Sequence, residues 1–179
     1  MRSDIGSGII AGLIGGVFFG IMMQMMNAPT PQGGEMPMMA MVAMVVRSDN
    51  TLVGWLYHLF NSALIGAIFG WLFGRRLQSF AAGLGWGAAY GFVWWILGAL
   101  ILMPIFLGML PLAPLIMEPM RPVAVGSLLG HLIYGIILGG SLVMMKRRTL
   151  GVALKDEPRE TGGTDSLRRL SKQPKGDKR

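Results

Sequence analysis

Two histidines, His58 and His131, are the residues of this chain whose type and placement suit chemistry. Each lies in a long apolar stretch, WLYHLFNSALIGAIFG at 55–70 and GSLLGHLIYGIILGG at 126–140. An imidazole in such a stretch is costly to bury, so it serves either as a ligand or as a hydrogen-bonding group inside a helix bundle. The two stretches share Leu, His, Leu and Gly at an offset of 73 residues, which predicts that the histidines occupy equivalent places.

Such a pair matches the axial ligands of one haem b or another tetrapyrrole. Asn61, Ser62 and Tyr134 lie three or four residues from a histidine, so they are candidates to hold the imidazole tautomers by hydrogen bonds. The alternative is that each histidine hydrogen-bonds across a tight helix contact. The neighbouring glycines favour this alternative, because closely packed helices leave no slot for a flat ring. The sequence leaves both interpretations open.

Methionine offers a different chemistry. Nine of the 16 methionines fall between Met22 and Met44, and thioether sulfur is a soft ligand that suits Cu(I). Met22 with Met26, and Met41 with Met44, have the spacing that places two sulfurs on one helix face. Methionine is also a flexible apolar filler of irregular cores, so copper is a lesser alternative.

Several classes of enzyme are not expected. The chain has no Cys, and no Asp or Glu lies inside its apolar stretches, which argues against thiolate chemistry, di-iron carboxylate sites and carboxylate proton relays. There is no GxSxG, no GxxxxGK[ST] and no HExxH. We therefore expect a protein that is not an enzyme.

Four helices must position these residues. The chain is 53% hydrophobic and 14% charged, and its apolar runs at 5–26, 52–73, 80–102 and 123–145 are long enough to span a bilayer. We expect an all-α, integral membrane four-helix bundle. The apolar segments 36–46 and 105–117 are too short or too rich in proline to span, so we expect short re-entrant or interfacial pieces there.

An internal repeat organises these helices. AGLIGGVFFG at 11–20 matches AGLGWGAAYG at 82–91 with an offset of 71 residues, close to the offset between the histidines. The chain thus reads as two tandem two-helix repeats. Because each repeat crosses the membrane twice, the copies should be related by a pseudo-two-fold axis along the membrane normal.

Small residues recur every four positions along all four helices. Residues four apart share a helix face, and small side chains on that face let helix backbones approach closely. The histidines lie on the same faces, which predicts that they point into the bundle. The expected packing glycines are Gly8, Gly12, Gly16, Gly20, Gly66, Gly70, Gly83, Gly87, Gly91, Gly135 and Gly139.

The distribution of charge predicts topology. All but two of the 16 Lys and Arg residues fall at the termini or between the second and third helices, and the exceptions are Arg47 and Arg121. This bias predicts that both termini are cytoplasmic and explains the net charge of +7 without nucleic acid. Residues 1–148 form the expected membrane domain, and 149–179 form a basic, polar cytoplasmic tail suited to anionic lipid.

The pairing of GWLYHLFNSALIGAIFG with GSLLGHLIYGIILGG resembles an uncharacterised family of small four-helix bacterial membrane proteins, a domain of unknown function. The resemblance covers roughly residues 5–145. It implies the bacterial inner membrane and no established activity.

These observations favour a non-catalytic multipass protein that acts as a structural or accessory subunit of a larger membrane complex or homo-oligomer. The reason is the number of GxxxG faces, which exceeds what one small bundle needs. The principal alternative is a bis-histidine haem or pigment protein that transfers electrons. Cu(I) handling and small-solute transport are lesser alternatives.

Overall fold

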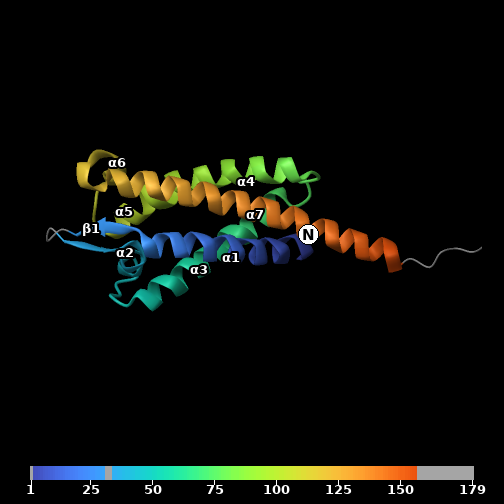
Figure 1. Cartoon of the computed structure of the whole chain (residues 1–179), viewed down its shortest axis with the longest axis horizontal. Coiled ribbons are helices and arrows are strands. Elements are labelled where there is room, and N and C mark those ends of the chain that lie inside the picture. Colours follow the sequence, from blue (N-terminus) through green and yellow to red (C-terminus); the bar gives the residue numbers. More distant parts are fainter. Residues whose placement is uncertain (1, 31–33, 157–179) are drawn as a thin grey trace, which may run out of the picture. The chain divides into compact units, whose positions relative to one another are not determined.

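The chain forms four apolar helices that are long enough to cross a membrane (Figure 1). The structure is a computed structural model that describes the backbone of residues 2–30 and 34–156 and the side chains of residues 4–30 and 34–148. The prediction of a mostly helical chain with four helices long and apolar enough to span a membrane is confirmed. The candidate spans are Asp4–Met25, Thr51–Phe73, Phe80–Phe106 and Glu118–Arg148.

The spanning helices are joined by short elements. The first and second spans are formed by α1 (Arg2–Met25) and α3 (Thr51–Phe73). The third is formed by α4 (Phe80–Trp94), the π-helix η1 (Trp95–Leu102) and α5 (Met103–Phe106), and the fourth mainly by α7 (Arg121–Asp156). The side chains of Asn50 and Ser79 cap α3 and α4 by accepting from the Leu52 and Ala82 amides. We call the end of the bundle formed by residues 26–30, 34–50 and 103–120 the loop end, and the end at residues 74–79 the turn end.

The loop end contains more structure than the sequence predicted. Strands β1 (Asn27–Pro29) and β2 (Glu35–Pro37) form a small antiparallel ribbon that we did not expect, and α2 (Met38–Met44) follows it. Within the predicted segment 105–117, the helix α6 (Ala113–Ile116) forms, followed by the 3₁₀ turn η2 (Glu118–Met120).

The third span extends past its predicted end at residue 102 and through Pro104. Proline has no amide hydrogen, so the carbonyl one turn before it loses its usual helical donor. The amide of Leu112 replaces that donor, because it binds the Leu100 oxygen at 2.7 Å. The Leu100 carbonyl thus binds the loop that follows the helix, and the helix continues through Pro104.

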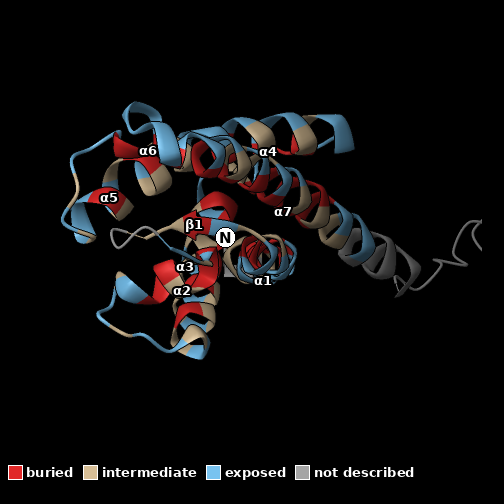
Figure 2. Ribbon diagram, turned by 60° about the vertical axis from the view of Figure 1, so that its left-hand side comes forward, coloured by how far each residue is buried: buried red, intermediate tan, exposed pale blue. Residues whose placement is uncertain are grey.

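Two helix pairs make the closest contacts. We call α1 with α3 the first hairpin, and α4, η1 and α5 with α7 the second hairpin. In the first hairpin a Cβ at Gly8 would overlap the Gly66 carbonyl oxygen, and in the second a Cβ at Gly87 would overlap the Gly135 carbonyl oxygen. Figure 2 shows buried residues along the faces where helices meet and exposed residues on the outward faces. Only glycine permits these backbone approaches.

Side chains connect the two hairpins. The Tyr134 hydroxyl donates to the Ser62 carbonyl at 2.8 Å, and the Tyr90 hydroxyl donates to the Ile65 carbonyl at 2.9 Å. At the turn end, Lys146 pairs with Asp4 at 3.6 Å and also donates to the Gly74 carbonyl. These contacts join α3 and α1 to α4 and α7.

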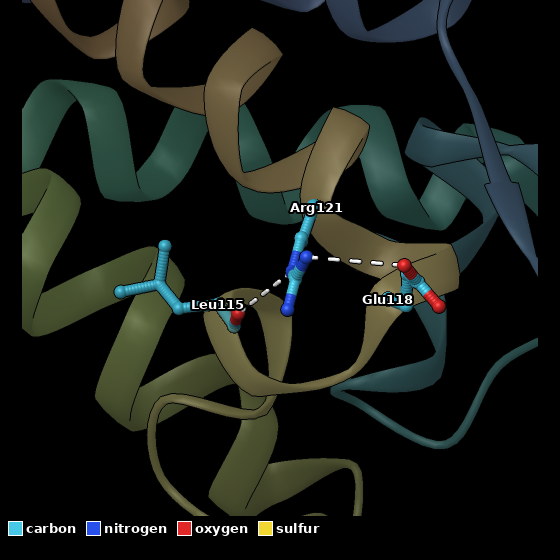
Figure 3. A network of polar contacts seen from close by, with 3 residues as sticks. All are labelled: Leu115, Glu118 and Arg121. Atoms are coloured by element: carbon cyan, nitrogen blue, oxygen red, sulfur yellow. Dashed lines mark hydrogen bonds and ion pairs between the residues drawn. The ribbon is translucent and has the colours of Figure 1, made fainter.

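The entry into α7 is held by weaker contacts. Arg121 lies 4.0 Å from Glu118 and donates to the Leu115 carbonyl at 3.4 Å (Figure 3). Both charged side chains are exposed. The chain divides into two compact units at Arg148, and α7 continues into the second unit as far as Asp156. The side chains of the predicted basic tail, 149–179, lie outside the described residues.

Candidate functional site

His58 is held by the opposite helix of its hairpin. Its Nε2 lies 2.8 Å from the carbonyl oxygen of Gly16 on α1. A carbonyl oxygen only accepts hydrogen bonds, so Nε2 carries the proton and Nδ1 carries a lone pair. A Cβ at Gly16 would overlap the Ser62 side chain, so glycine at this position permits the close approach of α1 and α3 at which the contact forms.

His131 is held by its own helix. Its Nδ1 lies 2.7 Å from the Ser127 carbonyl, one turn earlier on α7. By the same argument Nδ1 carries the proton and Nε2 carries the lone pair. Nε2 faces the π-helix, where a Cβ at Gly98 would lie 3.9 Å from it.

Each histidine therefore keeps one ring nitrogen as a hydrogen-bond acceptor. Within the described residues neither His58 Nδ1 nor His131 Nε2 has a hydrogen-bond partner, and no fully buried side-chain nitrogen or oxygen lacks one. Both acceptor nitrogens are therefore accessible, and His58 and His131 line the same cavity inside the bundle. Histidines that bind metals are often held in the same way, because one ring nitrogen donates to a carbonyl and the other is free to bind the metal.

The cavity has a volume of about 180 Å³ and a mostly apolar wall. It lies in the half of the bundle next to the loop end, between α3 and the segment formed by η1 and α5. The π-helix contributes Gly98, Ala99 and Leu102, and such irregular helical segments often occur at functional sites. We call it the histidine cavity. Its polar residues are Tyr57, His58, Asn61, Ser62, Ser127, His131 and Tyr134.

Phe19 of α1 contacts both imidazoles. Its ring centroid lies 5.5 Å from that of His58 and 4.7 Å from that of His131, with an edge-to-face arrangement in each case. The structure thus brings the two predicted site residues to one cavity. A phenyl ring, and not an open slot, lies against both of them.

The predicted partners of the imidazoles bind elsewhere. Asn61 donates to the Tyr57 carbonyl, Ser62 to the His58 carbonyl and Tyr134 to the Ser62 carbonyl, at 3.0, 2.8 and 2.8 Å. All three line the cavity, but none makes a hydrogen bond with an imidazole nitrogen. Main-chain carbonyls hold the tautomers instead, and residue types do not reveal which carbonyls lie within reach.

The four predicted copper ligands are not gathered in one place. Met22 and Met26 pack over Gly130 and Gly126 of α7, whereas Met44 is 42% exposed. Met41 does line a second, very small cavity at the loop end, of about 10 Å³. We call this the methionine cavity. Its methionines are Met38, Met41, Met103, Met109 and Met120. Within the described residues, no group of three or more His, Asp or Glu side chains is placed to hold a metal.

The predicted packing glycines all lie at contacts inside the hairpins. Gly20 lies under the Trp55 ring, and the others face backbone or side-chain atoms of the partner helix. In the first hairpin these are Gly8, Gly12, Gly16, Gly66 and Gly70, and in the second Gly83, Gly87, Gly91, Gly135 and Gly139. They therefore do not supply a free face for another protein.

Known proteins add no further information on this site. No family model, no curated protein and no solved structure matches the chain. Any function must therefore be argued from the geometry of the two cavities.

Proposed function

We propose that the protein binds a small, neutral, mainly apolar molecule inside the membrane, with His58 and His131 as hydrogen-bond acceptors. The observation that carries this proposal is that carbonyls fix one nitrogen of each imidazole and leave the other bare at one cavity. A ligand with a hydroxyl or amine hydrogen matches such acceptors. The mainly apolar wall favours an uncharged ligand.

The size of the cavity supports a ligand of about one aromatic ring. At about 180 Å³, the histidine cavity is slightly larger than the roughly 150 Å³ engineered protein cavity that binds benzene. Pockets for drug-sized ligands occupy about 300–1,000 Å³. A tetrapyrrole between the histidines would need the helices to separate and Phe19 to leave both rings. The geometry therefore favours the small ligand over haem.

Binding is better supported than transport. On the turn-end side of the cavity, the hydroxyls of Tyr134 and Tyr90 bridge to α3, and Phe69 is fully buried. These hydrogen bonds tie α4 and α7 to α3 on that side of the cavity. We propose that the ligand enters and leaves from the loop-end half.

We further propose that the hairpins are two copies of one unit in the bacterial inner membrane, with both termini cytoplasmic. The glycine contacts support the repeat, because Gly16 faces Ser62 and the matching Gly87 faces Gly135. The bias of Lys and Arg supports the topology. An accessory role in a complex or homo-oligomer, and anionic lipid at the tail, stay predictions.

The test compares phenol with anisole, which have the same ring but differ in the ability to donate. In equilibrium dialysis of the detergent-solubilised protein, phenol should bind about fivefold more tightly, the equivalent of one neutral hydrogen bond of about 1 kcal/mol. The double variant His58→Phe with His131→Phe should remove this preference while anisole binding persists. Long-range proton–nitrogen spectra should show His58 protonated at Nε2 and His131 at Nδ1, with phenol shifting the bare nitrogens.

Matched glycine variants locate the ligand. Gly98→Leu should fill the cavity and abolish binding of both probes, whereas Gly85→Leu, where a Cβ would meet nothing within 4 Å, should leave both unchanged. Undiminished phenol binding by Gly98→Leu would sink the proposal. So would a haem absorption spectrum from native membranes that disappears in His58→Ala.

A further inference from the structure

The methionine cavity brings together side chains that are far apart in the sequence. Met38 and Met41 come from α2, Met103 from α5, Met109 from the loop after α5, and Met120 from η2. Met38, Met41 and Met120 are at most 7% exposed. The connection between the first two spans and the connection between the last two spans thus meet at this cavity. The β1–β2 ribbon, the Leu112–Leu100 hydrogen bond and the entry into α7 lie in or next to these connections.

The chemistry of the wall is uniform. No charged residue lines the cavity, and the described lining residues other than the methionines are Ala99, Pro104, Leu107, Pro114, Val123 and Ser127. Five neutral thioethers and one hydroxyl disfavour Mg²⁺, Ca²⁺ and Zn²⁺, which prefer oxygen, imidazole or thiolate. Thioether sulfur suits a soft ion, and Cu(I) carries a single charge that is less costly to bury than a divalent one.

The volume limits the occupant to a single small particle. A space of about 10 Å³ corresponds to about one water-sized sphere, so no organic molecule fits. A water molecule needs two to four polar partners, and this wall offers it the Ser127 hydroxyl, which already donates to the Ala124 carbonyl. The space therefore fits one ion better than one water.

We infer that a Cu(I) ion binds in the methionine cavity, between α2, α5 and η2, through thioethers of the lining methionines. The ordinary explanation is that methionine fills irregular cores, as the fully buried Met39 does. What favours a site is that five methionines from four separate segments, α2, α5, the loop after α5 and η2, line the same small cavity. This site does not depend on the ligand proposed for the histidine cavity, although the two cavities share Met38 and Met103.

The test is an anaerobic titration of the detergent-solubilised full chain with Cu(I), in competition with a chromophoric Cu(I) chelator. We expect one equivalent to bind and Zn²⁺ not to bind at the same site. The triple variant Met41→Leu, Met109→Leu and Met120→Leu should lose affinity at least about 100-fold, because even outer partners of metal ligands cost 10- to 100-fold when removed. These three residues line the methionine cavity and not the histidine cavity.

The matched control removes the same number of sulfurs elsewhere. Met25→Leu, Met39→Leu and Met44→Leu change methionines outside both cavities, so this triple variant should bind Cu(I) within about twofold of the unmodified chain. Equal losses in the two triple variants, or no loss in either, would overturn the inference. Absence of Cu(I) binding by the unmodified chain would overturn it as well.

Two further measurements separate this site from the histidine cavity. X-ray absorption of the unmodified copper-loaded protein should show sulfur neighbours and no imidazole, which decides the matter even where the leucine variant fails to fold. His58→Phe with His131→Phe should lose the phenol preference and retain Cu(I). Loss of Cu(I) in that variant, or imidazole in the absorption spectrum, would place the metal at the histidines and overturn the assignment.

Discussion

The first hairpin joins its helices through its histidine, whereas the second does not. His58 donates across the helix interface to Gly16, and His131 donates back along α7 to Ser127. The difference follows from the opposite helix: α1 stays regular beside His58, but the helix facing His131 becomes the π-helix η1, whose Trp95 donates to the Ser127 hydroxyl. Related sequence positions can therefore carry a structural histidine in one hairpin and a more adaptable one in the other.

The largest effect is expected where the hairpins are most alike. Gly66→Leu and Gly87→Leu each force a side chain into a carbonyl of the partner helix, so each should lower the free energy of unfolding by about 3 kcal/mol or more. Unfolding in mixed micelles measures both. Gly85→Leu is the control, and a similar loss there would show that backbone approach is not the cause.

The histidines should then differ in stability. His58→Ala removes the side-chain hydrogen bond that joins α3 to α1, which should cost about 1–3 kcal/mol. His131→Ala removes a bond within one helix that joins no second helix, so it should cost less, about 1 kcal/mol. The same unfolding assay measures the two. Equal losses would contradict the asymmetry between the hairpins.

A smaller effect is expected from the contact that links the hairpins at the turn end. Lys146 and Asp4 are 25% and 14% exposed, so solvent screens their pair only in part. A double-mutant cycle with Lys146→Met and Asp4→Asn should give a coupling free energy of about 1 kcal/mol. A coupling of zero would show that the Lys146–Asp4 pair does not help to join the hairpins.

The smallest effect is expected at the entry to α7. Glu118 and Arg121 are 88% and 59% exposed and lie 4.0 Å apart, so Glu118→Gln should change the free energy of unfolding by less than about 0.5 kcal/mol. Comparison of this loss with the Lys146–Asp4 coupling shows how much burial changes the free energy that a charge pair contributes in this protein. A loss above 1 kcal/mol would mean that Glu118 has another role at the loop end.

The spans and packing faces were predictable because they depend on periodicity. Apolar runs of about 20 residues indicate which segments can cross a membrane, and glycines four apart indicate which helix faces pack closely together. The segment after residue 102 was predicted less well. Its extension through Pro104 depends on Leu112, and a hydrogen bond from a distant amide leaves no pattern in the sequence.

The two histidines of the candidate site were predictable, and so were Asn61, Ser62 and Tyr134 as neighbours that line it, but the hydrogen-bond partners of the imidazoles were not. The histidines stand out by type and by repeat, but Gly16 and Ser127 act through their carbonyls, which every residue possesses. Met109 and Met120 were missed for a related reason. They lie in irregular connections between proline-containing turns, where no helical spacing relates them to Met38 or Met41.

The division of the packing glycines between the hairpins also bears on biosynthesis. Because Gly8, Gly12, Gly16 and Gly20 face residues of α3, these four glycine contacts can form as soon as α3 has been made. Synthesis proceeds from the N-terminus, so this pair can dock while α4 and α7 are still absent. The histidine cavity forms last, because it requires Gly98 and His131. A ligand can therefore bind there only after the whole bundle has been inserted.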